Sequence, residues 1–177
     1  MQSVNTKENP DDENPTLRPL AGRHALITGG NRGIGAAIAE ELASLGANLT
    51  LAARDEESLN LQREKLSRTG DVAVSIQTMD LRQPASIAAA AAAAGDDLGP
   101  ISILVNNAGV APSAPLAKVE LDSWRETFDV NVQAAFLLAQ AMVPGMQELG
   151  FGRIVNLAST AGLRAYPFVA AYVASKH

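Results

Sequence analysis

The sequence predicts an α/β fold, a doubly wound parallel sheet that ends after the fifth strand and the start of the following helix. Three observations favour this class. Five short apolar or β-branched segments alternate with four helical segments, the order of strand–helix–strand units joined by right-handed crossovers. One segment, ISILV at Ile101–Val105, is apolar throughout, as in a strand covered on both faces. No second group of strands follows, so a single sheet is expected.

Each strand is predicted from a local feature. The first leads directly into glycines, the second lies between Gly46 and the candidate helix cap Asp55, and the third is rich in β-branched residues. The fourth and fifth are short apolar runs. The expected strands are His24–Thr28, Asn48–Arg54, Val72–Asp80, Ile101–Val105 and Arg153–Leu157.

The helices are predicted from apolar periodicity and from their ends. Apolar residues recur at helical spacing after Ile34, and Gly46 supplies a stop. Seven consecutive alanines at 88–94 favour a helix, because alanine has the highest helix propensity. Pro84 is expected to open that helix and Gly95 to end it. The expected helices are Ile34–Leu45, Glu56–Ser67, Pro84–Ala94, Asp122–Gln147 and a last one beginning between 167 and 171.

Composition excludes several classes of function. Of the 177 residues, 47% are hydrophobic and 19% charged, which provides enough apolar material for a buried core. The formal net charge of −5 argues against a nucleic-acid partner, since domains that bind phosphate backbones are usually basic. Without cysteine the chain has no disulfide, thiolate metal site or cysteine nucleophile. Only 2 histidines are present, so no metal site is expected.

The N-terminal segment differs in composition from the rest of the chain. Residues 1–20 are polar, contain prolines and lack the apolar centre of a signal peptide, so a flexible tail is expected there. Residues 21–177 are expected to form one domain. No stretch reaches the roughly 18 consecutive apolar residues of a membrane-spanning helix. The sequence therefore predicts a cytoplasmic protein with no membrane partner.

A glycine-rich turn, Thr28–Gly35 (TGGNRGIG), joins the first expected strand to the first expected helix. Glycines at such a turn let the chain bend sharply, let the backbone approach a pyrophosphate and let the helix pack closely on the strand. The helix N-terminus also offers free N–H groups to an anion. No Gly-Lys-Ser/Thr follows, which excludes a P-loop. The turn predicts a Rossmann-type dinucleotide-binding domain over residues 21–177.

The end of the second strand indicates which dinucleotide is bound. NAD sites usually place an acidic residue about 20 positions after the glycines, where it holds the ribose 2′-hydroxyl. This chain has Arg54 there, and a guanidinium can bind a 2′-phosphate through two hydrogen bonds. Arg32 can approach the same group, whereas Asp55 fits a helix cap. NADP is therefore expected in preference to NAD, and two solvated arginines are the alternative interpretation.

Six motifs resemble the short-chain dehydrogenase/reductase family, in particular its 3-oxoacyl reductases, from Ala21 to the last residue. In chain order they are Thr28–Gly35 (T-G-x-x-x-G-x-G), Asp80-Leu81, Asn106–Gly109 (N-N-A-G), Asn131, Ser159 and Tyr172–Lys176 (Y-x-x-x-K). Ser159 stands 13 residues before Tyr172, at the family's serine position. Any one motif could arise by chance, but six in the right order could hardly do so.

The resemblance implies the residues of a site. The implied catalytic residues are Asn131, Ser159, Tyr172 and Lys176. The implied cofactor-binding residues are Thr28, Gly29, Asn31, Arg32, Gly33, Ile34, Gly35, Arg54, Asp80, Leu81, Asn107, Ala108, Gly109, Tyr172 and Lys176. The resemblance further implies an oxidoreductase that transfers a hydride between NADP(H) and a small carbonyl or alcohol substrate. A homodimer or homotetramer is implied for the full-length protein.

The chemistry of the last motif can be argued from its residues. Tyr172 and Lys176 are four positions apart and therefore share one face of a helix. A cation one turn away stabilises the phenolate, so Tyr172 can act as acid in carbonyl reduction and as base in alcohol oxidation. Ser159 can donate a hydrogen bond to the substrate oxygen, where negative charge develops. By resemblance, Asn131 holds a water that links Lys176 to solvent.

Two interpretations of function stay open. The chain stops one residue after Lys176, where members of the family continue, so the last helix is expected to have few packing partners. The fifth strand is expected to be an exposed apolar edge. Little or no reductase activity is therefore expected of these 177 residues alone, although a longer parent should be active. The alternative is a truncated, non-catalytic dinucleotide-binding module. Acyl thioesters, sugars, steroids and simple alcohols all remain open as substrates.

Overall fold

The computed structural model describes residues 18–69 and 71–177, which form a five-stranded parallel sheet with helices on both faces. The strands are β1 (His24–Thr28), β2 (Asn48–Ala53), β3 (Val74–Thr78), β4 (Ile103–Asn106) and β5 (Arg153–Asn156). Their spatial order is β3-β2-β1-β4-β5, so the winding reverses between β1 and β4. Doubly wound sheets bind ligands at the carboxyl ends of the strands at such a switch point. The predicted fold class is confirmed.

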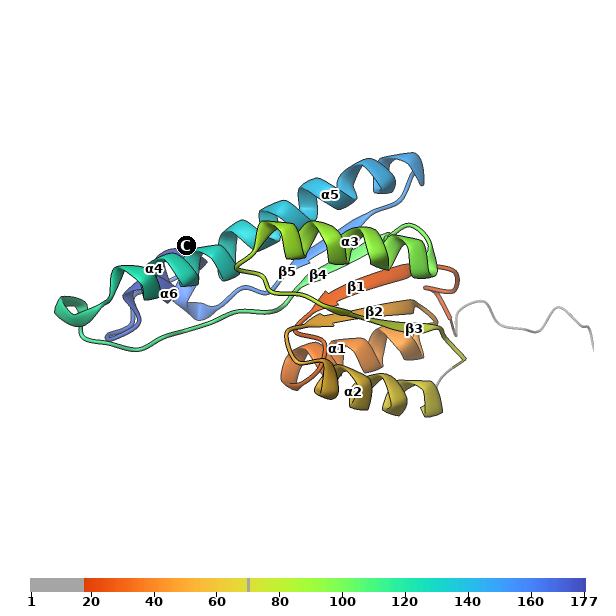
Figure 1. The fold of residues 1–177 in the computed structure, drawn as a ribbon, viewed down its shortest axis with the longest axis horizontal. Helices are drawn as coiled ribbons and strands as arrows, with labels where there is room; N and C mark the ends of the chain where they lie inside the picture. Colours follow the sequence, from red (N-terminus) through yellow and green to blue (C-terminus); the bar gives the residue numbers. More distant parts are fainter. Residues whose placement is uncertain (1–17, 70) are drawn as a thin grey trace, which may run out of the picture.

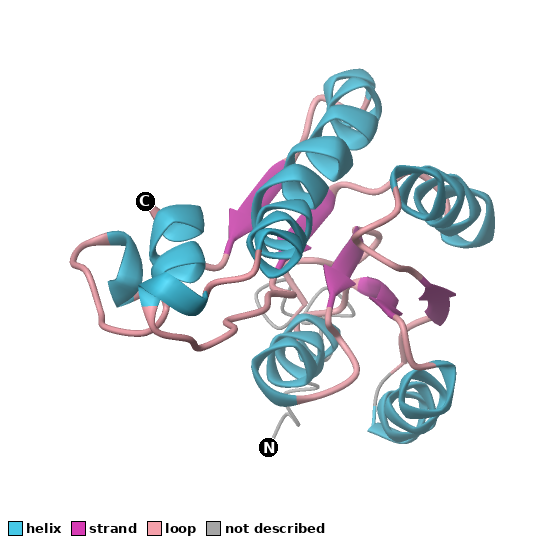
Figure 2. Ribbon diagram, turned by 60° about the vertical axis from the view of Figure 1, so that its left-hand side comes forward, coloured by secondary structure: helices cyan, strands magenta, loops and turns pink. Residues whose placement is uncertain are grey.

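The helices form a layer on each face of the sheet (Figures 1 and 2). α1 (Gly33–Ser44) and α2 (Glu56–Thr69) cover one face, while α3 (Pro84–Leu98) and α5 (Ala134–Glu148) cover the other. Each layer encloses its own hydrophobic core. Successive strand residues point to opposite faces, so the fully buried central strand β1 contributes to both cores.

A smaller group of elements extends beyond the carboxyl end of the sheet, on the left of Figure 1. This outlying group contains the 3-10 helix η1 (Leu116–Lys118), α4 (Leu121–Phe128), the 3-10 helix η3 (Thr160–Gly162) and α6 (Ala170–Lys176). α4 and α6 pack against each other. A π-helical turn at Asp129–Gln133 leads from α4 into α5. The group therefore brings together segments that follow β4 and β5.

Two predicted helices differ from those observed. The helix opened by Pro84 passes through Gly95 and ends at Leu98. A helix tolerates Gly95 at a modest cost, and the chain leaves the helix only at Gly99, whose φ of 82° favours glycine. The predicted helix Asp122–Gln147 is divided by the π-helical turn into α4 and α5.

The predicted N-terminal tail lies mostly outside the described residues, since its positions 1–17 are among those not described. Residues 18–20 contact the domain: Arg18 donates a hydrogen bond to the carbonyl of Asp71, and the Leu20 N–H donates to that of Leu45.

β5 is an edge strand of the sheet, and all four of its residues are exposed. Across the described part of the chain no helix is long and apolar enough to cross a membrane.

Candidate active site

Thr28 and Asn107 fasten the carboxyl ends of β1 and β4 together. The Thr28 hydroxyl accepts hydrogen bonds from the backbone N–H groups of Asn107 (3.0 Å) and Ala108 (3.1 Å). The Asn107 amide donates back to the carbonyls of Thr28 (2.8 Å) and Gly29 (3.3 Å). These reciprocal bonds join the end of β1 to the segment after β4, and they fix the path of the glycine turn.

The glycine turn disfavours side chains at its critical positions, by backbone conformation at Gly29 and Gly33 and by lack of space at Gly35. Gly29 and Gly33 have φ of 65° and 56°, a region that L-residues with side chains rarely occupy. A Cβ on Gly35 would collide with the carbonyl oxygen of Gly29 and come within 2.5 Å of the Asn107 amide nitrogen. The first turn of α1 therefore lies directly against the end of β1. This is the geometry of an anion-binding turn.

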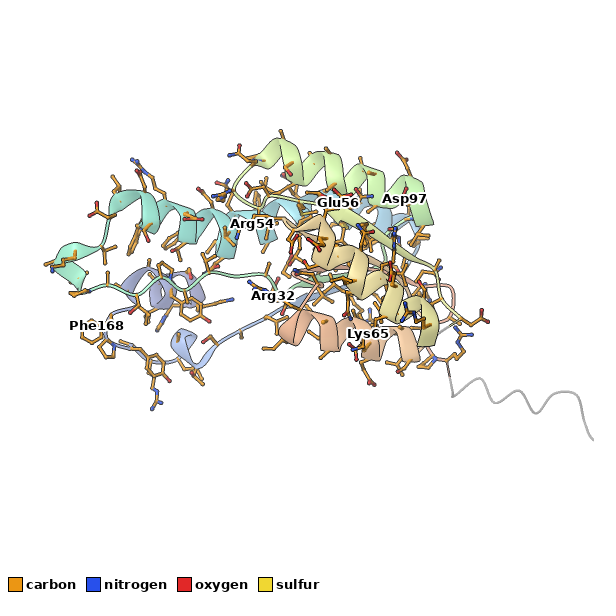
Figure 3. The ribbon with its side chains drawn as sticks, turned by 60° about the horizontal axis from the view of Figure 1, so that its bottom comes forward. Arg32, Arg54, Glu56, Lys65, Asp97 and Phe168 are labelled. Atoms are coloured by element: carbon orange, nitrogen blue, oxygen red, sulfur yellow. The ribbon has the colours of Figure 1, made fainter. Side chains whose placement is uncertain are left out.

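A cleft of about 640 Å³ opens beside this turn. It is lined by the glycine turn, by the ends of β2 and β3 and by the segment after β4. Arg32 and Arg54 both line it, and Figure 3 shows them at the same end of the sheet. Asn31 is held by a 2.8 Å bond from its amide to the Ser58 hydroxyl, which ties the turn to α2. Both arginines thus contribute to the wall of the same cleft.

Asp80, at the far side of this cleft, is fixed by a neighbouring cation. The Arg82 side chain donates hydrogen bonds to both carboxylate oxygens, at 2.7 to 3.2 Å, and the Arg82 backbone N–H adds another at 3.0 Å. These bonds hold the pKa of Asp80 at about 2, well below its ordinary value. Arg82 also lies 3.6 Å from a carboxylate oxygen of Glu126 on α4. The carboxylate is therefore both charged and oriented.

A second cleft, of about 420 Å³, adjoins the first and shares Leu81, Ala108 and Val130 with it. Asn131 and Lys176 line this second cleft. It reaches from the switch point toward β5 and α5. The two clefts together make a continuous surface along the carboxyl edge of the sheet.

Asn131 lies within the π-helical turn, and its side chain joins three segments. Its Oδ1 accepts a hydrogen bond from the Val110 N–H, and its Nδ2 donates to the Val110 carbonyl, both at 2.9 Å. The same nitrogen donates to the Ser175 hydroxyl at 2.9 Å. Ser175 in turn donates to the Tyr172 carbonyl at 2.8 Å. The π-helical turn, the segment after β4 and α6 are therefore held in one arrangement.

Tyr172 and Lys176 lie on α6, and η3 packs against that helix. The Lys176 ammonium is 6.0 Å from the centre of the Tyr172 ring and donates a 2.7 Å hydrogen bond to the Leu157 carbonyl after β5. Ser159 follows two residues later and caps η3, where its hydroxyl accepts from the Ala161 N–H at 3.1 Å. The predicted tyrosine, lysine and serine thus lie on neighbouring segments.

The two clefts collect most of the site residues proposed from the sequence. Those lining the first are Gly29, Asn31, Arg32, Gly33, Ile34, Arg54, Asp80, Leu81, Asn107, Ala108 and Gly109; those lining the second include Thr28, Leu81, Ala108, Asn131 and Lys176. Gly35 is buried beneath the turn. Ser159 and Tyr172 lie beside the second cleft and line neither.

Sequence reasoning missed the residues that position this site. Val110 and Ser175 hold Asn131, Arg82 holds Asp80, and Gly162 permits η3 to approach the Lys176 carbonyl, where a Cβ would collide. Ser175 stands inside the Tyr172–Lys176 motif, so a closer reading of that motif could have found it. Arg82 stands two residues after Asp80, so its bonds are also local. The contacts of Val110 and Gly162 cross between segments and leave no local signal in the sequence.

A glycine-lined cleft at the switch point of a parallel sheet is the structure of a dinucleotide-binding α/β fold. The chain belongs to the short chain dehydrogenase family, whose model matches residues 23–177. The predicted family is therefore confirmed.

Known proteins resemble much of the chain. It is 37% identical to gluconate 5-dehydrogenase from Gluconobacter oxydans over 92% of its length, and 36% identical to ketoacyl reductase HetN from a Nostoc species over 90%. It spans only 63% and 55% of those two relatives. The crystal structure of a metagenomic short-chain oxidoreductase in complex with NADP superimposes with a TM-score of 0.84 at 39% identity, covering 89% of this chain and 71% of that one.

Proposed function

We propose that the protein is an NADP-dependent oxidoreductase that interconverts a carbonyl compound and an alcohol. The observation that carries the proposal is the arrangement around α6. Lys176 lines the second cleft, lies beside Tyr172 and is anchored to the end of β5. A proton-carrying phenol, a cation and a dinucleotide cradle at one sheet edge suit hydride transfer coupled to proton transfer.

The residues of the first cleft fit a dinucleotide. A Cβ on Gly35 would collide with the carbonyl oxygen of Gly29, so only glycine fits at this position. The N–H groups at the start of α1 can bind a pyrophosphate. Asp80 is fixed for a contact with adenine. Arg32 and Arg54 supply two cations for a 2′-phosphate, which favours NADP over NAD. The structural relative with bound NADP supports the same choice.

The chain's own groups provide the proton chemistry. When bound, NADPH supplies a hydride to the carbonyl carbon. Tyr172 donates its hydroxyl proton to the carbonyl oxygen, so that a C–H bond and an O–H bond form as the C=O double bond becomes single. Ser159 donates a hydrogen bond to the same oxygen, where negative charge develops. Lys176 stabilises the phenolate left on Tyr172 until the tyrosine regains a proton from solvent.

Asn131 acts on the reaction through its neighbours. Its side-chain amide bonds to Val110 and Ser175 and so braces the π-helical turn against α6. A brace of this kind keeps the tyrosine and lysine within the narrow tolerance that catalysis requires. The proposed water that links Lys176 to solvent for proton exchange lies beside the π-helical turn that carries Asn131.

The proposal includes a cytoplasmic location and assembly as a homodimer or homotetramer. A chain without cysteine suits the reducing cytoplasm. Val132, Phe136 and Val143 expose 41%, 61% and 36% of their surface along the π-helical turn and α5, which supports a contact between subunits.

Replacement of Tyr172 by Phe tests the proposed function. The assay uses the full-length protein that the gene encodes. The substitution removes the proton donor and keeps the ring. We expect kcat for reduction of a reactive diketone by NADPH to fall about 10²–10⁴-fold, the range that a general acid provides. The dissociation constant of NADPH, measured by nicotinamide fluorescence, should change little.

Tyr166→Phe serves as the control, because Tyr166 is the other tyrosine of the chain and lies in the segment just before α6, the helix that carries Tyr172. It should keep kcat within a factor of about three, as a surface substitution does. An unchanged rate in Tyr172→Phe would contradict the acid role. Binding of NADPH with no turnover by the wild type would favour the non-catalytic module instead.

A further inference from the structure

The backbone of Asp80 is fixed independently of its side chain. Asp80 follows β3 and lines the first cleft. Its N–H donates a 2.9 Å hydrogen bond to the Ser86 hydroxyl, and its carbonyl accepts a 3.0 Å bond from the Gln83 N–H. Both partners lie at the start of α3, in its first turn or at its N-cap. The side chain of Asp80 therefore leaves the backbone in a fixed direction, and only its own torsions remain to be set.

Arg82 uses most of the acceptor capacity of the Asp80 carboxylate. A carboxylate offers about four lone-pair sites to hydrogen-bond donors. Three N–H groups of Arg82 occupy such sites: the backbone N–H bonds to Oδ1, Nη2 bonds to Oδ2, and Nε lies 2.9 and 3.2 Å from the two oxygens. About one acceptor site is therefore left. Since the Asp80 side chain is 27% exposed, that site is open to one further donor.

The Arg82 guanidinium acts on a ligand only through Asp80. It lies between two carboxylates, because an oxygen of Glu126 on α4 is 3.6 Å from Nη1. Arg82 does not line the first cleft, whereas Arg32 and Arg54 do. The planar guanidinium can hold both oxygens of one carboxylate at once, which fixes the plane of that carboxylate.

One acceptor on a fixed carboxylate distinguishes purine bases. Adenine carries an exocyclic amino group, which is a donor. Hypoxanthine carries a carbonyl oxygen at that position, and its ring N–H points in another direction. The amino group can use the remaining acceptor of Asp80, whereas the carbonyl oxygen meets a negative charge without a proton between them. A carboxylate that rotated freely could turn away from the carbonyl, so it would separate the two bases less well.

We propose that Arg82 is a positioning residue that makes the site selective for adenine, by holding the Asp80 carboxylate so that one acceptor faces the first cleft. This inference rests on the proposed dinucleotide-dependent function and deepens it, since it assigns base selectivity to a residue that acts through another side chain. The positive charge of Arg82 also offsets that of the Asp80 carboxylate, which would otherwise repel the phosphate groups of the dinucleotide.

The test measures two dissociation constants with the full-length protein, one for NADPH and one for its deamino analogue, reduced nicotinamide hypoxanthine dinucleotide phosphate. Nicotinamide fluorescence reports the binding of both. The wild type should bind the analogue at least about tenfold more weakly, since a hydrogen bond to a charged group contributes that much. In Arg82→Gln the ratio of the two constants should fall below about threefold, the effect of a poorly aligned exposed contact. General damage to the fold would weaken both ligands equally and leave the ratio unchanged.

Arg82→Lys separates charge from geometry. It keeps the positive charge, but an ammonium is a point charge that cannot hold both oxygens in one plane. We expect this variant to retain more of the NADPH affinity than Arg82→Gln does, with a ratio at least about threefold below that of the wild type. Circular dichroism establishes that each variant is folded, and Arg82→Lys by itself decides the question if Arg82→Gln is not.

Arg125→Gln is the matched control. Arg125 is exposed on α4, pairs with Asp122 and lines neither cleft. Its replacement should leave both constants and their ratio unchanged. A wild-type ratio in both Arg82 variants, or in Arg82→Lys alone, overturns the positioning role and leaves the proposed function standing. A wild type that binds the two dinucleotides equally also overturns it. No binding of NADPH by the wild type overturns the proposed function itself.

Discussion

Asn131 and Thr28 show how single side chains position this site. Each of them bonds to backbone groups of a segment far away in sequence: Asn131 to Val110, and Thr28 to Asn107 and Ala108. A side chain that satisfies backbone groups in this way fixes the course of a loop, because unpaired backbone groups in a partly buried position are costly. Small polar residues therefore fix the loops that form the site, and the charged residues lie on those loops.

Arg54→Asp should change the preference between the two dinucleotides. The substitution removes a charge-assisted bond to the 2′-phosphate and places a carboxylate where it can bind a ribose 2′-hydroxyl. Since a hydrogen bond to a charged group contributes about 1.5–3 kcal/mol, the dissociation constant of NADP should rise roughly 10- to 100-fold. Titrations of NADPH and NADH followed by nicotinamide fluorescence measure the ratio.

Arg68→Asp is the matched charge reversal for this experiment. Arg68 is exposed near the end of α2, pairs with Glu64 and does not line the cleft. Its replacement should leave the ratio of the two dissociation constants where it is in the wild type. If both variants weakened NADP equally, the effect of Arg54 would be a general effect of net charge.

Among the elements, the glycine turn and the π-helical turn set the relation between helices and sheet. The turn lets α1 begin directly against β1, and the π-helical turn directs the Asn131 side chain toward both Val110 and Ser175. π-helical turns often occur at functional sites. Here the turn lies where the long helix passes from the outlying group to the layer that covers the sheet.

Gly35→Ala and Gly95→Ala should have opposite effects on stability. A methyl group on Gly35 collides with the Gly29 carbonyl and the Asn107 amide, whereas one on Gly95 meets open space inside α3. Overpacking costs about 1–3 kcal/mol, so Gly35→Ala should lower the melting temperature by several degrees and weaken NADPH binding. Gly95→Ala should raise it by a few degrees, because alanine favours a helix by roughly 1 kcal/mol over glycine.

Thermal unfolding followed by circular dichroism checks both substitutions in one experiment. The same sign for both variants would show that backbone preference, and not the close approach of α1 to β1, governs the turn.

At the scale of the whole molecule, a chain of polar side chains crosses three strands at the end of the sheet opposite the clefts. His24 Nδ1 bonds to the Gly99 carbonyl and its Nε2 to the Thr50 hydroxyl, both at 2.8 Å, and Thr50 lies 2.7 Å from the Ser75 hydroxyl. A carbonyl can only accept, so Nδ1 carries the proton and Nε2 accepts from Thr50. The neutral imidazole thus links β1, β2 and β3 with the end of α3.

This network predicts how stability depends on pH. Burial lowers the pKa of His24 below 6.5, against smaller opposing effects of the Gly99 bond and the Asp97 charge. The unfolded chain therefore binds a proton that the folded chain refuses, and stability is lost as the pH falls below 6.5. The histidine contributes nothing to the pH dependence above that value, where it is neutral in both states.

Urea unfolding of the wild type and of His24→Asn between pH 8 and pH 5 measures this contribution. Below about pH 6.5 the wild type should lose up to about 1.4 kcal/mol per pH unit more than the variant. The carboxylates titrate in both proteins, so the difference in slope isolates His24. Equal slopes would contradict a neutral buried imidazole.

Much of the fold was predictable because its signals are local. β1 has the bounds expected from its sequence, β2 and β5 end one residue earlier than expected, and β3 and β4 differ by one or two residues at both ends. The prediction that Gly95 ends its helix was wrong, because the packing of that helix against the sheet outweighs the low helix propensity of one glycine. The π-helical turn was not predicted, and the partners of its Asn131 side chain, Val110 and Ser175, lie 21 and 44 residues away in the sequence.

The order of strands and helices, the glycine turn and the candidate site residues follow from the sequence alone, because periodicity, turn chemistry and motif spacing act over a few neighbouring positions. The tertiary structure decided which of those residues meet and what holds them: Asn131 lies between Val110 and Ser175, and Lys176 bonds to the Leu157 carbonyl. These facts depend on where remote segments come together, and that position is set by the packing of the whole sheet and its helices.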